Sequence, residues 1–206
     1  MSPRPRKASD DEVFQATHRA MSRLGPGELT LSEIAREAGL TAGALVQRFG
    51  SKRDLLLALS SRFSGGTSEM FDELRRAHRS PLATLRAYGD CISDLAASPA
   101  ALARNLSYLQ IDLTDPDFRK HLVAQARASR IEIEKLIDEA IAAGELVPAT
   151  RAPRLARTVE TILGGSMMSW AHYQEGTAAR WMREDLDAVL EPYLRVRRQK
   201  GRQRRS

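Results

Sequence analysis

Residues 30–55, TLSEIAREAGLTAGALVQRFGSKRDL, decide the fold because they start and stop two short helices in quick succession. Thr30 followed by Glu33 has the spacing of a capping box, in which each side chain accepts from a backbone N–H of the other residue. Gly39 can adopt the left-handed conformation that ends a helix, and Thr41 is a second N-cap. We therefore predict two helices joined by a tight turn.

The second of these helices has one face for the core and one for a partner. Leu45 and Phe49 lie one turn apart and are expected to point inward. Gly43 and Gln47 lie on the opposite side at helical spacing, and small residues there let a helix enter the major groove of DNA. A glutamine can pair with adenine through two hydrogen bonds. The pattern favours a helix-turn-helix, although an ordinary helical hairpin with a solvated polar face has the same local signals.

Residues 9–56 resemble the N-terminal domain of the TetR family of transcriptional regulators. The resemblance is carried by TLSEIAREAGLTAGALVQRFGSKRDLL, with its IA-x-x-AG-L run, G-x-L segment, F-x-SK and Leu pair. Val46 departs from the family, which usually has a Tyr there that often touches phosphate. The resemblance and the helical wheel together imply these DNA-facing residues: Thr41, Ala42, Gly43, Ala44, Gln47, Arg48 and Lys52.

The net charge of +6 comes from the two ends of the chain. Arg4, Arg6 and Lys7 precede the first expected helix, and seven further cations lie in 195–205. Neither end contains an acid, so the chain between them is net negative. We expect the N-terminal arm to lie against phosphates or in the minor groove. The alternative is a disordered solubilising tail, and for the C-terminal basic tail the two interpretations are equally supported.

Composition narrows the class of protein. Hydrophobic residues make up 42% of 206 residues, which permits a sizeable core. The single cysteine, Cys91, excludes an intramolecular disulfide framework and fits a reducing compartment. We find neither an apolar run long enough to span a membrane nor a signal peptide. We therefore expect a cytoplasmic protein, associated with the nucleoid through DNA and with no membrane partner.

The rest of the sequence predicts helices only. Ser-Pro or Asp-Pro pairs at 80–81, 98–99 and 115–116 each place an N-cap before a proline. A helix from Ser51 could run as far as Leu74 unless the Gly65-Gly66 pair breaks it. The expected fold is all-α, with about nine helices in a three-helix helix-turn-helix domain and a helical ligand-binding and dimerisation domain. The expected divisions are a basic arm (1–8), the DNA-binding domain (9–56), the effector domain (57–196) and a basic disordered tail (197–206).

Apolar stripes mark two closing helices, expected at about 154–175 and 178–196. The resemblance implies that the last two helices pair with their copies across a two-fold axis. A dimer would double the number of bases read. The alternative is that the stripes only complete a monomeric core. The expected interface residues are Leu163, Gly164, Gly165, Met167, Leu186, Val189, Leu190 and Tyr193.

The sequence does not favour an enzyme. Its four histidines have no metal-ligand spacing, and no Gly-rich loop follows a strand, so we expect no metal, cofactor or catalytic residue. Asp112, Asp115 and Asp117 are interpreted as acids at a helix N-terminus. The resemblance implies a site for a small-molecule effector. Polar or aromatic candidates on apolar helices, each of which could instead be a core or surface residue, are Tyr88, Asn105, Tyr108, Gln125, Trp170 and Tyr173.

The function expected is a homodimeric repressor that binds a near-palindromic operator in double-stranded DNA and is released by a small molecule. One alternative is a nonspecific or architectural nucleic-acid binder that uses the basic tails. Another is a ligand-binding or enzymatic helical domain with a vestigial DNA-binding module. A symmetric footprint that survives competitor DNA distinguishes the first from the second.

Overall fold

The computed structural model describes residues 8–195, and these form ten α-helices with two short 3-10 helices. The all-α class is confirmed. Arg4, Arg6, Lys7 and the 197–206 tail lie outside the described residues. The helices are α1 (Asp10–Arg23), α2 (Leu31–Ala38), α3 (Ala42–Phe49), α4 (Lys52–Gly65), α5 (Thr67–Ala77), α6 (Pro81–Ser93), α7 (Pro99–Thr114), α8 (Pro116–Ala142), α9 (Ala152–Tyr173) and α10 (Ala178–Leu190).

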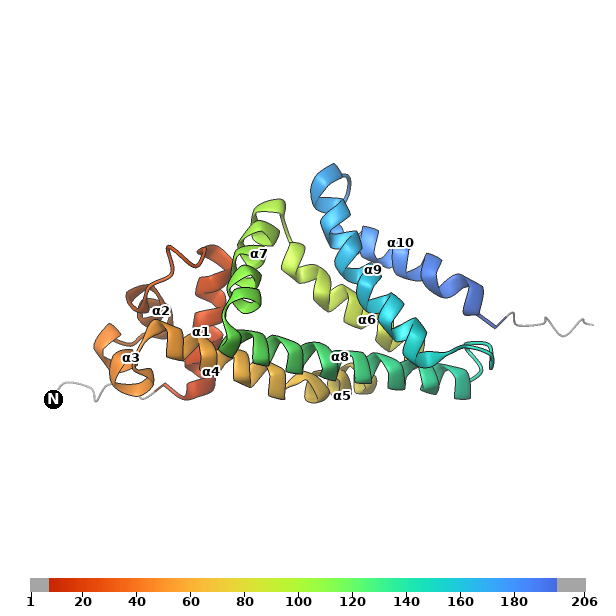
Figure 1. Cartoon of the computed structure of the whole chain (residues 1–206), viewed down its shortest axis with the longest axis horizontal. Helices are drawn as coiled ribbons and strands as arrows, with labels where there is room; N and C mark the ends of the chain where they lie inside the picture. Colours follow the sequence, from red (N-terminus) through yellow and green to blue (C-terminus); the bar gives the residue numbers. More distant parts are fainter. Residues whose placement is uncertain (1–7, 196–206) are drawn as a thin grey trace, which may run out of the picture.

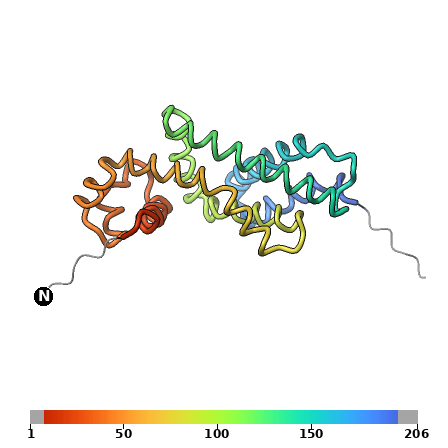
Figure 2. The backbone as a smooth tube through the Cα atoms, turned by 90° about the horizontal axis from the view of Figure 1, so that it is seen from below, coloured from red at the N-terminus to blue at the C-terminus, as the bar shows by residue number. Residues whose placement is uncertain are grey.

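The helices form an elongated molecule with a small N-terminal half and a larger C-terminal half (Figures 1 and 2). α1, α2 and α3 gather at one end, and α4 leads from them toward α5, alongside α8 (Figure 1). α6, α9 and α10 pack together at the other end, and α7 crosses between the two halves to contact both α1 and α8. Among the described residues, no helix is both long and apolar enough to cross a membrane.

The three N-cap and proline pairs start helices as predicted. Ser80 and Ser98 accept hydrogen bonds from the N–H groups three residues on, at 3.2 and 3.1 Å, and open α6 and α7. Asp115 accepts from the N–H of Asp117 at 3.0 Å and opens α8. A proline in the first turn loses nothing, because its missing N–H would have no helical partner there.

Two helix boundaries differ from the sequence-based expectation. The helix from Ser51 ends at Gly65, and α5 restarts at Thr67, because glycines are weak helix formers and two occur together. The last helix ends at Leu190 rather than near 196. Pro192 cannot donate a helical hydrogen bond, and the chain leaves through a 3-10 turn, Glu191–Tyr193.

The two larger of three hydrophobic clusters among the described residues form the cores of the two halves. The larger lies among α5, α6, α8, α9 and α10 and includes Phe71, Leu85 and Ile137. The N-terminal cluster contains buried residues from α1, α2, α3 and α4 but also Tyr108 from α7 and Phe118 from α8. The core of the helix-turn-helix half therefore continues into the C-terminal half, across the boundary expected at residue 56.

Candidate nucleic-acid interface

The α2–α3 unit is built by local hydrogen bonds. The Thr30 hydroxyl accepts from the N–H of Glu33 at 3.2 Å, and the Thr41 hydroxyl accepts from the N–H of Ala44 at 3.1 Å. Between the helices, Gly39 has φ +66° and ψ 31°, a left-handed conformation that other residues rarely adopt. The N–H of Leu40 then bonds to the Ala35 carbonyl at 2.8 Å and closes the turn. These contacts give the predicted helix-turn-helix.

One half of the predicted capping box at Thr30 is not formed. The Glu33 carboxylate pairs with Arg36 on the same helix and does not reach back to the Thr30 N–H. At Ser9, by contrast, both halves are present: its N–H donates to Glu12 at 2.7 Å, and its hydroxyl accepts from the Glu12 N–H. An available arginine one turn away accounts for the difference, because a charged partner competes well for a carboxylate.

The faces of α3 are those expected from the helical wheel. Leu45 is fully buried, and the Phe49 ring packs 5.9 Å from the Phe14 ring of α1. The expected DNA-facing residues lie toward the outside: Thr41, Gly43, Gln47 and Arg48 are exposed, whereas Ala42, Ala44 and Lys52 are half-buried. The outer face is therefore narrow, with small residues at its N-terminal end and Gln47 in reach of a partner.

Val46 belongs to this outer face. Its side chain is 49% exposed, next to Gln47 and one turn from Gly43. An aliphatic group there has no donor for a phosphate. It can instead contact the methyl group of thymine in the major groove.

Arg48 is engaged within the chain. Its guanidinium pairs with Asp10 in the first turn of α1 and donates to the Ala8 carbonyl at 2.5 Å. It also lies 5.4 Å from the centre of the Phe49 ring. These contacts turn the side chain toward α1. They also hold Ala8, the last residue of the N-terminal arm, beside α3. Arg48, expected to face the DNA, thus also holds Ala8 at the end of the arm.

Lys52 fastens the loop between α1 and α2. Its ammonium donates to the carbonyls of Pro26 at 3.0 Å and Leu29 at 2.8 Å. An ammonium has three donors, so one remains for a phosphate oxygen. The sequence indicated only that Lys52 faces the DNA. Nothing local predicted the loop contact, because it joins residues more than twenty positions apart.

Ion pairs join α1 to α2 behind this surface. Arg19 and Arg23 donate to opposite oxygens of the Glu37 carboxylate at 2.7 and 2.6 Å. The hydrogen bonds from these two arginines hold the pKa of Glu37 below its usual value. The pairs add to the contact between α1 and α2 that is made by the buried residues of both helices.

Helix α7 ties the C-terminal half to the end of α1. The Tyr108 hydroxyl donates to the Leu24 carbonyl at 2.8 Å, and Arg104 Nε donates to the Ser22 carbonyl at 3.0 Å. Burial raises the pKa of Tyr108 to about 12. Tyr108, expected to line a ligand site, therefore also links the two halves.

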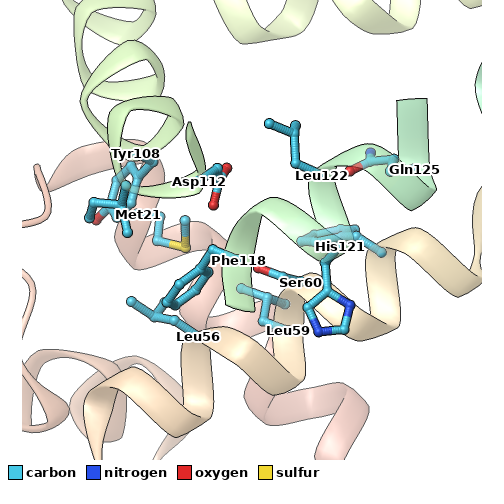
Figure 3. Close-up of a pocket in the computed structure, with 12 residues that line it drawn as sticks. Met21, Leu56, Leu59, Ser60, Tyr108, Asp112, Phe118, His121, Leu122 and Gln125 are labelled. Atoms are coloured by element: carbon cyan, nitrogen blue, oxygen red, sulfur yellow. The ribbon is translucent and has the colours of Figure 1, made fainter. Parts of the chain in front are cut away.

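The candidate effector residues do not form a single site. Tyr108 and Gln125 line a cavity of about 130 Å³ where α1, α4, α7 and α8 meet, here called the inner cavity (Figure 3). Tyr88 and Gln125 line a larger groove of about 740 Å³ between α1, α4, α5, α6 and α8, here called the interdomain groove. The other three lie elsewhere: Asn105 donates to the Leu95 carbonyl, Trp170 to the Gly176 carbonyl, and Tyr173 stacks on Trp181 at the surface.

The expected dimer residues divide into two groups. Leu163, Leu186 and Leu190 are at most 3% exposed and pack in the core of the chain itself, so their assignment to an interface is corrected. They pack inward because α9 and α10 cover α6. Gly164 and Gly165 are exposed, with no atom within 4 Å of an added Cβ. The remaining three, Met167, Val189 and Tyr193, are half-buried at the edge of the core.

The chain is similar in sequence to one protein family and in structure to several solved proteins. Residues 13–59 match the model of bacterial regulatory proteins of the tetR family. No curated protein sequence matches the chain. A TetR transcription regulator from Haloarcula marismortui superposes with a TM-score of 0.71 at 20% identity, covering 90% of this chain and 97% of the other.

Two further solved structures have the same fold. SmeT, the repressor of the Stenotrophomonas maltophilia multidrug efflux pump SmeDEF, is 21% identical with a TM-score of 0.63, and 93% of each chain is covered. FadR from Bacillus subtilis, solved with stearoyl-CoA, is 16% identical with a TM-score of 0.65, covering 88% of this chain and 97% of FadR. Residues 13–59 therefore match the DNA-binding domain of tetR-family regulators, and the chain as a whole has the same fold as solved TetR regulators.

Proposed function

We propose that the chain is a homodimeric repressor that binds a near-palindromic operator and is released by a small molecule. The observation that carries this proposal is the outer face of α3, where Gly43, Val46 and Gln47 are exposed on a helix held rigidly by its caps. A short recognition helix reads few bases, so a two-fold dimer with half-sites about 34–36 Å apart would supply the rest of the specificity.

The contacts to DNA are proposed to fall into two classes. Gln47 would read a base edge, with Val46 against a neighbouring methyl group. The third donor of Lys52 would bind phosphate. Because Arg48 holds Ala8 beside α3, we propose that the cations of the arm, Arg4, Arg6 and Lys7, add affinity for DNA that depends on salt.

The dimer is proposed to form through the outer faces of α9 and α10. Gly164 and Gly165 would allow a partner helix to approach closely, and Met168, which is 38% exposed on the same side, would supply apolar contact. Val189 and Tyr193 at the edge of the core would continue the surface onto α10.

Ligand release is proposed to act at the junction of the two halves. The inner cavity and the interdomain groove both have walls from the DNA-binding half and from the effector half. A ligand there would favour a different arrangement of α4 against α7 and α8, and a coupling of about 1–3 kcal/mol is typical of such linkage. SmeT is a repressor and FadR was solved with an acyl-CoA, which supports repression and ligand binding in this fold.

A footprint on the DNA flanking the gene for this chain tests operator binding. We expect protection of a symmetric site that survives excess competitor DNA. Diffuse protection that disappears with modest salt would instead support a nonspecific binder acting through the basic tails.

Sedimentation of Gly165→Arg tests the dimer. The monomer has room for the new side chain, so loss of the dimer with unchanged helical content is expected. Ala103→Arg, at an exposed position on α7, is the matched control and should leave the dimer intact. A dimer that persists in Gly165→Arg places the interface elsewhere.

A further inference from the structure

Asp112 is a half-buried carboxylate in the last turn of α7. It was expected near a helix N-terminus, but it lies two residues before α7 ends at Thr114. Among the described residues it has no hydrogen-bond or ion-pair partner. Burial raises its pKa above the usual value. A carboxylate withdrawn from water without a partner is costly, so its charge is available to a ligand.

Asp112 lines the inner cavity, whose other walls are mainly apolar and aromatic (Figure 3). The rings of Phe63, Tyr108 and Phe118 line the same space. No arginine or lysine is among the described residues lining it, and its one basic side chain is the imidazole of His121. The Tyr108 hydroxyl already donates to the Leu24 carbonyl. A negative charge beside aromatic faces is the environment that favours an organic cation.

The interdomain groove has the same imbalance of charge. It shares Leu59, Phe63 and Gln125 with the inner cavity as lining residues. Its two arginines, Arg19 and Arg62, are paired with Glu37 and Asp11 respectively.

Two of the carboxylates that line the groove are unpaired. Glu69 and Glu73, one turn apart on α5, have no partner among the described residues. A ligand that approaches the junction through the groove therefore meets uncompensated negative charge. This arrangement attracts cations and repels anions.

We propose that the inner cavity binds the charged end of a small organic cation with an apolar body, and that Asp112 is its counter-ion. A volume of about 130 Å³ suits a group near the size of one six-membered ring. The inference rests on the proposed ligand-released repressor and adds the chemical class of the effector.

The position of the cavity connects its occupant to both halves. Its lining includes Met21 of α1 and Leu56 of α4 as well as Tyr108 of α7 and Phe118 of α8. An occupant would therefore press on the helices whose contacts set the position of the helix-turn-helix.

Calorimetry on the full chain without DNA tests the proposal, with benzylamine, benzyl alcohol and benzoate as probes of similar size. We expect benzylamine to bind about tenfold tighter than benzyl alcohol, the ratio of a charge-assisted contact, and benzoate to bind weakest. Asp112→Asn should remove the preference for benzylamine. Asp138→Asn, which removes an exposed carboxylate elsewhere on α8, should keep it.

Three results would overturn the proposal: no benzylamine binding, equal binding of benzylamine and benzyl alcohol, or an Asp112→Asn protein that keeps the preference. Ser60→Leu, which narrows the cavity from α4, should abolish binding of all three probes, and binding that persists would place the site elsewhere. Because the measurement contains no DNA, its failure leaves the operator footprint unaffected, and a failed footprint leaves the cation site intact.

Discussion

Arg53, in the first turn of α4, binds the Asp115 carboxylate at the N-terminus of α8 through both of its oxygens. Arg53 Nη2 lies 2.9 Å from Oδ1 and 2.8 Å from Oδ2, and Nε lies 3.2 Å from Oδ2. The same guanidinium contacts Asp117 at 2.7 Å. The contact joins the helix after the recognition helix to the longest helix of the effector half, more than sixty residues away.

Lowering the pH should weaken the contact between Arg53 and Asp115. The Arg53 guanidinium holds the pKa of Asp115 below its usual value. A carboxyl whose folded pKa is lowered contributes stability above its unfolded pKa of about 3.9 and loses it as pH falls through the folded value. We expect the urea midpoint to drop as pH is lowered from about 5 to 3, less steeply in Asp115→Asn than in wild type. Equal slopes in the two proteins would show that the pair contributes nothing measurable.

Asp115 is also the N-cap of α8, and two substitutions separate this role from its ion pair with Arg53. Asparagine carries no charge but still caps a helix, whereas alanine has neither a charge nor a capping group. At neutral pH, Asp115→Ala should therefore have a lower urea midpoint than Asp115→Asn. The reverse order would mean that the cap at the start of α8 is not used.

Lys52→Met should lower both stability and the salt dependence of DNA binding. The substitution keeps the stem but leaves the carbonyls of Pro26 and Leu29 without their donor, a loss of about 1.5–3 kcal/mol for bonds to a charged group. It also removes the donor proposed for phosphate, so the slope of log affinity against log salt should fall by about one.

Lys120→Met is the control, because Lys120 is exposed on α8 away from α3. It should change neither the urea midpoint nor the salt slope. If Lys52→Met is destabilised but keeps the wild-type salt slope, Lys52 stabilises the loop and does not bind phosphate.

Gln47→Ala should reduce specific binding and spare nonspecific binding. Gln47 is exposed on α3 and has no partner within the described chain, so truncation costs no intramolecular contact. Loss of one bidentate base contact corresponds to about 1–3 kcal/mol of discrimination. Fluorescence anisotropy with the operator and a scrambled duplex measures the difference.

Arg48→Ala should behave differently from Gln47→Ala. It removes the contacts to Asp10 and Ala8 that hold the start of the arm, so nonspecific affinity should fall along with specific affinity. If specific binding is unchanged in both variants, the outer face of α3 is not the recognition surface.

Tyr108→Phe should loosen the link between α7 and α1. The substitution removes the hydroxyl that donates to the Leu24 carbonyl, at a cost of about 1 kcal/mol. Tyr173→Phe is the matched control, since the hydroxyl of that exposed side chain has no hydrogen bond in the described chain. Equal urea midpoints for the two variants would contradict a stabilising role for the Tyr108 contact.

Alkaline titration tests the raised pKa of Tyr108. A phenol whose folded pKa is raised contributes stability that is present below its unfolded value of about 10 and is lost as pH rises through the folded value. Ultraviolet titration should show one tyrosine ionising near pH 12, and this step should be absent in Tyr108→Phe.

The sequence by itself determined the helix-turn-helix, the helix starts and the class of function. N-caps at Thr41, Ser80 and Ser98 and the left-handed Gly39 act through hydrogen bonds within a few residues, so local spacing is enough to predict them. The exposed position of Gln47 followed from the same short-range geometry, because a helix has a fixed angle per residue.

Only the tertiary structure decided which partners the long side chains have and which apolar faces are covered. Lys52 binds a loop, and Arg53 binds a helix far along the chain, through contacts that no spacing in the sequence indicates. Leu163 and Leu186 lie on stripes that could equally face a second chain or their own core, and the packing of α9 and α10 on α6 buries them. The position of the unpaired Asp112 at a cavity where four helices meet is likewise a result of the tertiary structure. An apolar stripe in the sequence predicts that a helix face is buried, but it does not predict which helices bury it.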